Sequence, residues 1–419
     1  MSFWRAAYST LLLLLVPFAL LRLLWRGRRQ PGYLRHIPER FGFYSSPIDA
    51  PVIWLHAVSV GETRAAEPLV KALRERWPSH RLLLTHMTPT GRATGDQVFG
   101  DTVSRCYLPY DLPWATTRFL SHFRPQLGLL LETELWPNLI CACKTRSIPL
   151  YLVNARLSER SASGYARFSR FTRATLQALA GVAAQTSADA ERLAALGAEQ
   201  VTVCGNLKFD RSPRPEDLEL AERFRHWFGQ RPVFVAASTR EGEEEKVLEA
   251  VEVASQPQLL TVIVPRHPQR FDAVAKMIAA RSLAYQRRSA GQSVASTTAV
   301  VLGDSMGELY AYYGASDLAF IGGSLLPLGG QNLLEACAMG KPVIVGPHTF
   351  NFEEATQLAI NAGAAVQIGD VEELGQAIAE LLADAERRGL MGQAGLALMG
   401  QHQGAAQRIV AMLQEISRR

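Results

Sequence analysis

The sequence predicts an α/β protein of two doubly wound, Rossmann-like domains behind an apolar N-terminal segment. Its 419 residues are too many for one ordinary core and suit two domains of roughly 150–200 residues each. Short apolar runs alternate with helical stretches in two successive series, which predicts two parallel sheets covered on both faces. A polar, Pro-rich stretch from Arg211 to Pro215 separates the series and is typical of a linker. Ligands of such sheets bind beyond the carboxyl ends of the strands, so we expect the two domains to face a central cleft.

The N-terminal segment predicts attachment to a membrane. Residues 6–21 carry no charge and include five consecutive leucines. The chain has a net charge of +5, but residues 1–40 hold seven Arg and one Glu, so this stretch carries +6 and the other 379 residues sum to −1. A nucleic-acid-binding protein would carry basic residues across its folded body. We therefore expect an anionic membrane surface, and no nucleic acid, as a partner, and assign residues 1–27 to a membrane anchor.

The anchor is expected to remain uncleaved. A span needs about 20 apolar residues, so this one is short but close, and a spanning helix is favoured over an interfacial one. A cleaved signal has its positive charges before the apolar run, whereas here Arg22, Arg26, Arg28 and Arg29 follow it. These arginines keep the following chain on the cytoplasmic side. The five cysteines are odd in number and form no C-x-x-C pair, which is typical of free thiols in the cytoplasm.

The first domain is predicted between residues 28 and 210, with a helix over 63–77 that has apolar residues at helical spacing. Its expected strands are residues 51–57, 81–85, 127–131, 149–153 and 181–184.

The second domain is predicted between residues 211 and 395, and a C-terminal helix over residues 396–419. Its expected strands are residues 232–236, 259–264, 299–302, 318–321 and 342–345.

Glu62 is the first candidate site residue. The motif His56-Ala-Val-Ser-Val-Gly-Glu62 joins the first strand to a helix through a small turn. With Ser59 as the N-cap, Glu62 falls at the third helical position, which is the arrangement of a capping box. The same position lies at the carboxyl edge of the sheet, where the helix dipole would favour the ionised form that a general base needs. Both interpretations remain open on the residues alone.

Glu132 and Glu134 directly follow an apolar strand. If the strand continues that far, alternation places both carboxylates on one face. A Glu-x-Glu pair can bind a metal ion, but the chain has no Asp-x-Asp motif and no His near this pair. We therefore expect no metal site here.

Four segments of the second domain predict a nucleotide site. Ser238-Thr-Arg240 opens a helix after a strand, a position suited to an anion. Arg266 and His267 add a cation at the same sheet edge. Gly-rich segments over 303–307 and 322–330 follow other strands, and the backbone N–H groups of such loops can reach phosphate. Neither a G-x-G-x-x-G fingerprint after an opening strand nor a P-loop occurs, which argues against dinucleotide oxidoreductases and P-loop NTPases.

Taken together, the motifs resemble those of bacterial 3-deoxy-D-manno-octulosonic acid (Kdo) transferases, almost from end to end. The segments that carry the resemblance are residues 56–62, 131–138, 154–161, 205–210, 238–244, 264–271, 303–310, 320–347 and 351–352. Two departures are mild, because Gln331 stands where His is expected and Cys337 where Pro is common. The resemblance implies the two-domain glycosyltransferase B architecture, with an acceptor-binding first domain and a nucleotide-sugar-binding second domain.

The resemblance also implies an activity and a place in the cell. The family moves Kdo from the donor CMP-Kdo to the lipid A precursor, lipid IVA, in lipopolysaccharide assembly. The reaction proceeds with inversion, without a catalytic metal and without a further cofactor. We expect the enzyme at the inner membrane, with its catalytic domains on the cytoplasmic face. The number of Kdo residues added, the acylation of the acceptor and the oligomeric state are not predicted.

The resemblance assigns roles to individual residues. Glu62 becomes the base that deprotonates the acceptor hydroxyl, while Glu132 and Lys208 stabilise the transition state. The residues expected to hold CMP are Arg266, His267, Met306, Gly307, Glu308, Asn332, Leu333, Leu334 and Glu335. Glu335, near the start of a helix, is placed to accept hydrogen bonds from ribose hydroxyls.

Two other classes of function remain as alternatives. A UDP-sugar transferase or a non-hydrolysing UDP-sugar 2-epimerase would share the architecture, although the anchor argues against a soluble epimerase. A membrane-tethered binding protein without catalysis would leave the carboxylates and Gly-rich loops unexplained.

Overall fold

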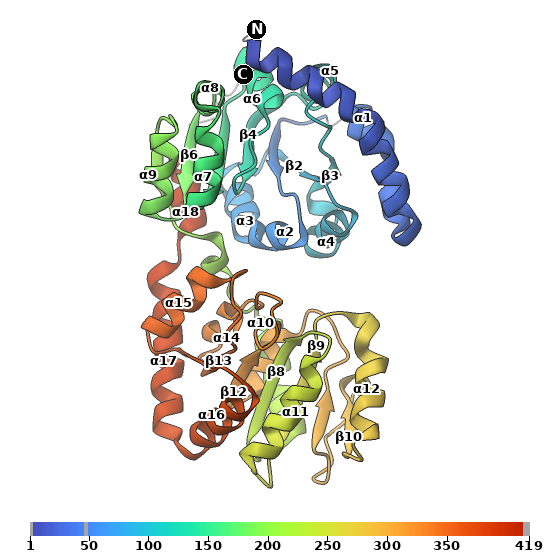
Figure 1. Cartoon of the computed structure of the whole chain (residues 1–419), viewed down its shortest axis with the longest axis vertical. Helices are drawn as coiled ribbons and strands as arrows, with labels where there is room; N and C mark the ends of the chain where they lie inside the picture. The colour runs from blue at the N-terminus through green and yellow to red at the C-terminus, as the bar shows by residue number, and fades with distance from the viewer. Residues whose placement is uncertain (1–2, 46–48, 414–419) are drawn as a thin grey trace. The chain divides into compact units, whose positions relative to one another are not determined.

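The computed structural model describes residues 3–45 and 49–413 and divides the chain into two compact units (Figure 1). The first unit runs to Arg211 and includes the C-terminal segment from Gln403 onward, and the second unit is Ser212–His402. Each unit contains a seven-stranded, all-parallel sheet among the described residues. The predicted fold of two Rossmann-like α/β domains is therefore present, unit by unit.

The sheet of the first unit has the strand order β3-β2-β1-β4-β5-β6-β7. Its strands are β1 (Val52–His56), β2 (Arg81–His86), β3 (Ser104–Tyr107), β4 (Pro125–Leu131), β5 (Leu150–Ala155), β6 (Gly181–Ala184) and β7 (Val201–Val203). The order reverses between β1 and β4, where His56 pairs with Leu130. The turns that follow these two strands are therefore neighbours at a topological switch point, where open α/β sheets bind ligands.

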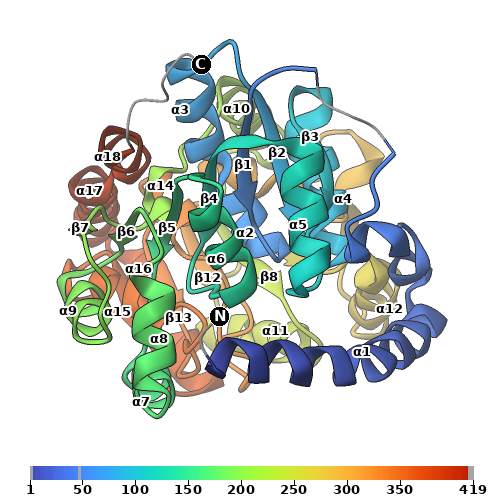
Figure 2. The same cartoon turned by 90° about the horizontal axis from the view of Figure 1, so that it is seen from above.

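Helices of the first unit cover both faces of this sheet (Figure 2). They are α1 (Phe3–Arg29), α2 (Val60–Ala65), α3 (Glu67–Arg76), α4 (Pro89–Phe99), α5 (Pro113–Phe123), α6 (Pro137–Thr145), α7 (Glu159–Ala166), α8 (Ser169–Leu176), α9 (Ser187–Ala195) and α18 (Ala405–Met412). The predicted helix over 63–77 is two helices that meet at Ala66. The break has a local cause, because Pro68 lacks an N–H group and restricts the residue before it.

The sheet of the second unit has the order β10-β11-β9-β8-β12-β13-β14 and reverses between β8 and β12. Its strands are β8 (Val233–Thr239), β9 (Leu260–Pro265), β10 (Tyr285–Arg287), β11 (Val300–Leu302), β12 (Leu318–Ile321), β13 (Val343–Val345) and β14 (Ala365–Gln367). Its helices are α10 (Pro215–Phe228), α11 (Glu243–Ala254), α12 (Phe271–Ala280), α13 (Leu309–Ala315), α14 (Leu334–Ala338), α15 (Glu353–Asn361), α16 (Val371–Ala383) and α17 (Ala385–His402).

Ten of the fourteen strands coincide with predicted apolar runs, and the other four are the outermost strands of the sheets, β3, β7, β10 and β14. An outer strand is paired on one side only, so it needs less apolar sequence than a central strand does. Strand β7, for example, has no buried residue.

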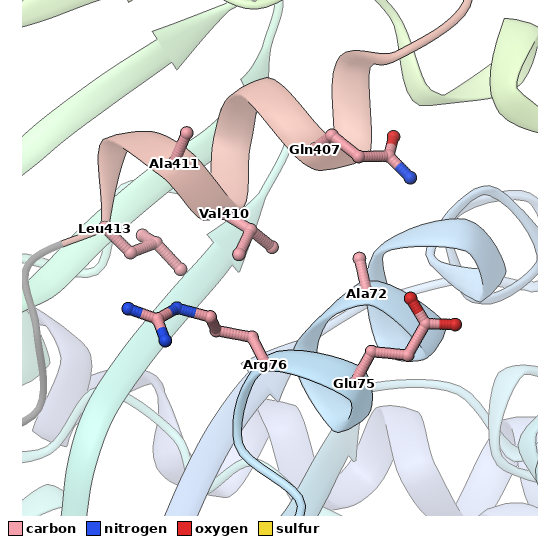
Figure 3. A pocket seen from close by; sticks show the side chains of 7 residues that line it. All are labelled: Ala72, Glu75, Arg76, Gln407, Val410, Ala411 and Leu413. Atoms are coloured by element: carbon pink, nitrogen blue, oxygen red, sulfur yellow. The ribbon is translucent and has the colours of Figure 1, made fainter.

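Over residues 396–413, the C-terminal region differs from the single helix predicted over 396–419, whose last six residues lie outside the described part of the chain. Helix α17 already begins at Ala385 and belongs to the second unit, whereas α18 packs in the first unit. Gly404, with φ 92°, stands between them. Ala405, Ala406 and Ile409 of α18 join the core of the first unit. Beside this contact, side chains of α3 and α18 line a pocket of about 600 Å³, with Glu75 and Arg76 on one side and Val410 on the other (Figure 3).

Asp210 holds the start of α18 to the first unit. Its carboxylate accepts the backbone N–H groups of Gly404 (2.7 Å), Ala405 (3.1 Å) and Ala406 (2.6 Å). These are the N–H groups that have no partner inside a helix. The side chain of Asp210, nearly two hundred residues earlier in the sequence, thus fixes the position at which α18 packs on the first unit.

We predict that Asp210→Ala lowers the free energy of unfolding of the first unit by about 1–2 kcal/mol, the usual range for loss of a helix cap. Thermal unfolding, combined with hydrogen exchange over residues 404–412, measures this. Asp210→Asn keeps an acceptor oxygen and should lose less. Unchanged stability and unchanged exchange in the alanine variant would contradict the capping role.

Candidate active site

Glu62 caps helix α2 and keeps an accessible carboxylate. Ser59 is the N-cap, and its hydroxyl oxygen accepts the N–H of Glu62 at 3.4 Å. In return, Glu62 accepts the Val58 N–H and the Ser59 hydroxyl, both at 2.8 Å. The predicted capping arrangement is present, although the returning carboxylate binds the N–H of the residue before the cap. An ionised carboxylate has about four acceptor positions, so two hydrogen bonds leave room to accept a proton from a ligand.

The pKa of Glu62 is raised to about 7. Burial is the largest cause, and the negative charge of Glu132 is the next. The hydrogen bonds from Val58 and Ser59 act in the opposite direction, and Glu134 adds a smaller increase. The helix dipole is not among these causes, so its expected effect on the ionised form of Glu62 stays a prediction. A base with a pKa near 7 is well matched to proton transfer at neutral pH.

Glu132 and Glu134 lie on the turn after β4. Strand β4 ends at Leu131, and Glu132 has a φ of 57°, so the strand alternation expected for the two carboxylates does not extend to them. A left-handed conformation in a non-glycine residue costs on the order of 1 kcal/mol and often occurs at functional sites. Glu134 accepts the indole N–H of Trp136 at 3.0 Å, and burial raises the pKa of Glu134. The structure therefore brings three carboxylates together at the switch point of the first sheet.

Lys208 lies on the short helix η4 (Leu207–Asp210), which follows β7, three strands from β4 in the sheet order. Asn154, fully buried at the end of β5, accepts the Leu207 N–H at 3.0 Å and so fixes η4. Asn154 also has a positive φ, 53°. The sequence predicted no role for Asn154, although this residue lies in the segment 154–161 that carries part of the family resemblance. The role of Lys208 in the transition state remains a prediction.

Cations gather at the carboxyl ends of β8 and β9 in the second unit. The pKa of His267 is lowered, first by burial and then by the positive charges of Arg240, Arg266 and Arg270. Arg270 is paired with Glu244 at 2.9 Å. The Arg266 Nε donates to the Gln331 side-chain oxygen at 3.2 Å, which links this cluster to the Gly-rich loop. An anion would be attracted to this edge of the sheet.

The Gly-rich loop offers fewer N–H groups than the sequence predicted. The buried carboxylate of Glu243 accepts the N–H groups of Gly323 (2.5 Å), Leu325 (3.1 Å) and Arg240 (2.9 Å). The Gly322 N–H donates to the Ala237 carbonyl at 2.8 Å. The chain's own acceptors therefore bind the N–H groups of Gly322, Gly323 and Leu325. For the rest of the two Gly-rich segments, contact with phosphate stays a prediction.

Glu308 is held by its own chain. Arg288 donates to both its carboxylate oxygens, at 3.1 and 2.7 Å, and the Ser305 hydroxyl donates to it as well. The Arg288 guanidinium lies over the Phe224 ring, 4.9 Å from the centroid. Ser289 adds a second attachment through its N–H (2.8 Å) and hydroxyl (2.7 Å) to Asp304. Within this turn, Met306 is exposed and Gly307 has a φ of 83°.

The segment 332–335 presents two kinds of residue. Leu333 and Leu334 are buried in the core, so only their backbone is available to a ligand. Asn332 accepts the Leu334 N–H at 3.2 Å, and Glu335 lies in the first turn of α14 with 8% of its surface exposed. Among the residues that the structure describes, no group of three or more His, Cys, Asp or Glu side chains could hold a metal ion.

Comparison with known proteins places these features in a family. Residues 35–211 match 3-deoxy-D-manno-octulosonic-acid transferase (kdotransferase), and residues 233–397 match glycosyl transferases group 1. The chain is 44% identical to the 3-deoxy-D-manno-octulosonic acid transferase of Bordetella pertussis, over 98% of this chain and 99% of that protein. It is 39% identical to the Haemophilus influenzae enzyme of the same name, over 98% of each.

The chain belongs to the Kdo transferase family. The predicted resemblance and the glycosyltransferase class are thereby confirmed. Solved structures show the same fold. UDP-GlcNAc 2-epimerase from Neisseria meningitidis has a TM-score of 0.59 at 18% identity, covering 86% of this chain and 99% of that one. A glycosyltransferase from Rickettsia africae has a TM-score of 0.59 at 14% sequence identity, covering 88% of this chain and 99% of that one. At such identities the likeness shows the fold alone, and it confirms the glycosyltransferase B type of this Kdo transferase.

The raised pKa of Glu62 predicts the pH dependence of the enzyme. As the general base predicted from the sequence, Glu62 would act in its ionised form, so kcat/KM should rise with pH through an apparent pKa near 7 and then level off. Glu132→Gln removes a neighbouring negative charge and should move this limb to lower pH. Glu134→Gln is the matched control, because its charge is the smallest of the causes, and it should move the limb less. If kcat/KM rose at the same pH in the wild-type enzyme and in both variants, the assignment of this pKa to Glu62 would be contradicted.

The Arg288–Glu308 pair predicts a non-additive effect on donor binding. Arg288→Ala and Glu308→Ala should each raise the KM for the sugar donor several-fold, because the turn over 303–308 loses its attachment. The double variant should be no worse than either single variant, since the residues act as a pair. Steady-state kinetics with varied donor and fixed acceptor measure this. Additive effects would instead indicate that Glu308 touches the ligand itself.

Proposed function

We propose that this enzyme transfers Kdo from CMP-Kdo to the lipid A precursor, lipid IVA, in lipopolysaccharide core assembly, with inversion and without a metal ion. The observation that carries the proposal is the half-buried Glu62 carboxylate, with a pKa of about 7 beside Glu132, at the switch point of the first sheet. The names of the Bordetella and Haemophilus relatives support the transferred sugar.

The proposed chemistry is a single displacement at the anomeric carbon of Kdo. An acceptor hydroxyl oxygen forms the new C–O bond while the bond to the CMP phosphate oxygen breaks. The hydroxyl proton passes to Glu62, and CMP leaves with the bonding electron pair. One displacement with a general base inverts the anomeric centre.

Charges on the two units suit this displacement. The transition state carries positive charge on the sugar ring, which the nearby carboxylate of Glu132 would offset. Lys208, on the same sheet edge, would offset negative charge. On the second unit, the leaving CMP gains negative charge on its phosphate. Arg240 and Arg266, whose charges already lower the pKa of His267, would take the place that a divalent cation fills in other transferases.

The donor is also proposed to contact the turn over 303–308 and the segment 331–335. Gln331 accepts a hydrogen bond from Arg266, which joins the segment 331–335 to the cations that follow β9. Glu335 would accept hydrogen bonds from ribose hydroxyls, and the exposed Met306 and Gly307 would lie against the base. In this account Glu308 positions the turn through Arg288.

We also place the enzyme at the cytoplasmic face of the inner membrane. Helix α1 has a mean hydropathy of 2.0 over its most apolar window and is long enough to cross a bilayer. The arginines at its end would attract anionic lipid, each contributing about 1 kcal/mol near the surface.

The test is product analysis with purified full-length enzyme. Mass spectrometry should show a Kdo adduct from CMP-Kdo and tetra-acylated lipid A precursor, and none from UDP-N-acetylglucosamine. Glu62→Gln keeps an acceptor for the Val58 N–H but cannot take the proton, so turnover should fall about 10²-fold or more while CMP binding persists. Transfer from the UDP sugar alone, or near-normal turnover of the variant, would refute the proposal.

Metal independence has its own measurement. Turnover in excess EDTA should stay within about two-fold of that in Mg²⁺, because the guanidinium groups already supply positive charge at the leaving phosphate. A control with a metal-dependent glycosyltransferase shows that the chelator is effective. Loss of activity in EDTA that Mg²⁺ or Mn²⁺ restores would contradict this.

A further inference from the structure

Helix α1 has one face turned toward the first unit along its whole length. The residues of this face recur at every third or fourth position and are less exposed than their neighbours, as expected for one side of an α-helix. They are Arg5, Tyr8, Leu12, Val16, Ala19, Leu23 and Gly27. We call them the inner face of α1.

The first turns of α1 bind helix α6 through polar side chains. The Arg5 guanidinium donates to the Cys141 sulfur, and the Ser9 hydroxyl donates to the Asn138 side-chain oxygen at 3.1 Å. The Tyr8 hydroxyl hydrogen-bonds the Asp111 carboxylate. Asp111 in turn accepts the first N–H groups of α6, those of Asn138 (2.9 Å) and Leu139 (2.8 Å). We call this set of contacts the α6 latch.

The last turns of α1 bind the same unit. Leu23 and Gly27 are buried, and a Cβ atom on Gly27 would collide with the Leu34 side chain. Arg26 donates to the Tyr33 hydroxyl at 3.3 Å and lies over its ring, 5.4 Å from the centroid. Figure 2 shows α1 running along the side of the unit, with its start near α6. The last turns of α1 therefore pack against the short segment that directly follows them, whereas its first turns bind α6.

The α6 latch conflicts with a helix that crosses a bilayer. At a rise of 1.5 Å per residue, residues 5 and 27 are about 33 Å apart along the axis, the thickness of a hydrocarbon core. If α1 spanned, Arg5, Tyr8 and Ser9 would lie at the far surface. They could not reach α6, because α6 is part of the folded unit on the near side.

The outer face of α1 is apolar and exposed. Its large side chains are Phe3, Trp4, Leu11, Leu13, Leu14, Leu15, Phe18, Leu21, Leu24 and Trp25, each at least 44% exposed. Soluble monomers rarely expose so continuous an apolar strip, and such strips mark contact surfaces. The exposed Arg22, Arg28 and Arg29 stand near the C-terminal end of the strip. Aliphatic and aromatic groups bordered by cations suit the acyl-chain and anionic headgroup regions of one leaflet.

We propose that α1 lies in the plane of a single anionic leaflet, with its outer face in the acyl-chain boundary and its inner face fixed to the first unit by the α6 latch. Both ends of α1 then stay on the side of the catalytic units. This replaces the spanning helix that the sequence favoured. The inference rests on the membrane attachment proposed above, but not on the donor, the acceptor or the reaction.

The latch also connects the membrane to the carboxylates. Helix α6 begins after Trp136, whose indole donates to Glu134. Asp111 ties the start of α6 to α1, and the turn that carries Glu132 and Glu134 leads directly into this helix. A leaflet that holds α1 would thereby hold this turn at a fixed depth, close to where a lipid acceptor presents its sugar.

The first test is membrane topology, which needs no activity. The full chain, with one epitope tag at its N-terminus and another at its C-terminus, is exposed to protease in spheroplasts and in inverted inner-membrane vesicles. We expect both tags to be cut in the inverted vesicles and both to be protected in spheroplasts. An N-terminal tag cut only in spheroplasts would show a spanning helix. Recovery of the protein outside the membrane fraction would also overturn the proposal.

The second test is thiol cross-linking of the latch in native membranes, in a Cys141→Ser background. Ser9→Cys combined with Asn138→Cys should give an intramolecular product with a short bis-thiol reagent, because the native side-chain oxygens are 3.1 Å apart. Leu14→Cys with Asn138→Cys is the matched control and should give none, since Leu14 is on the outer face. No product from the first pair would refute the latch. A covalent dimer through Leu14→Cys would show that a second copy, and not lipid, covers the outer face.

Discussion

Side-chain carboxylates that accept backbone N–H groups fix the turns and helix starts on which the rest of this structure depends. Asp111 binds the start of α6, Asp210 the start of α18, and Glu243 the Gly-rich loop. Asp189 does the same for Leu157 after β5. A buried N–H group without a partner costs about 1–3 kcal/mol, so each carboxylate determines which turn conformation is stable at the functional edge of its sheet.

The binding of backbone N–H groups by these carboxylates determines which polar groups remain available to a ligand. In the second unit, Glu243 binds the N–H groups of Gly323, Leu325 and Arg240, and we propose that the side chains of Arg240 and Arg266 bind the anion. In the first unit, Glu62 is a capping carboxylate of the same kind, but it is only partly buried and keeps free acceptor positions. Burial and Glu132 raise its pKa to about 7. The same side chain can therefore cap a helix and accept a proton.

Local patterns in the sequence predicted the central strands, the cap at Ser59 and the carboxylates after β1 and β4, because apolar runs and capping residues act over a few positions. The edge strands were missed because they need little apolar sequence. The roles of Glu243 and Arg288 were also missed. Their partners are 80 and 20 residues away, and no short-range pattern records such contacts. The C-terminal helix was misplaced for the same reason, since Asp210 binds α18 across the chain.

We propose that the two units have different tasks, in which the second unit binds the donor nucleotide and the carboxylates of the first unit act on the acceptor. Hydrogen exchange of the full-length enzyme, measured by mass spectrometry with and without saturating CMP, tests it most directly. The account predicts slower exchange over residues 303–308 and 331–335 and unchanged exchange over residues 58–62 and 131–136. Slower exchange around Glu62 and Glu132, with no change in the second unit, would contradict it.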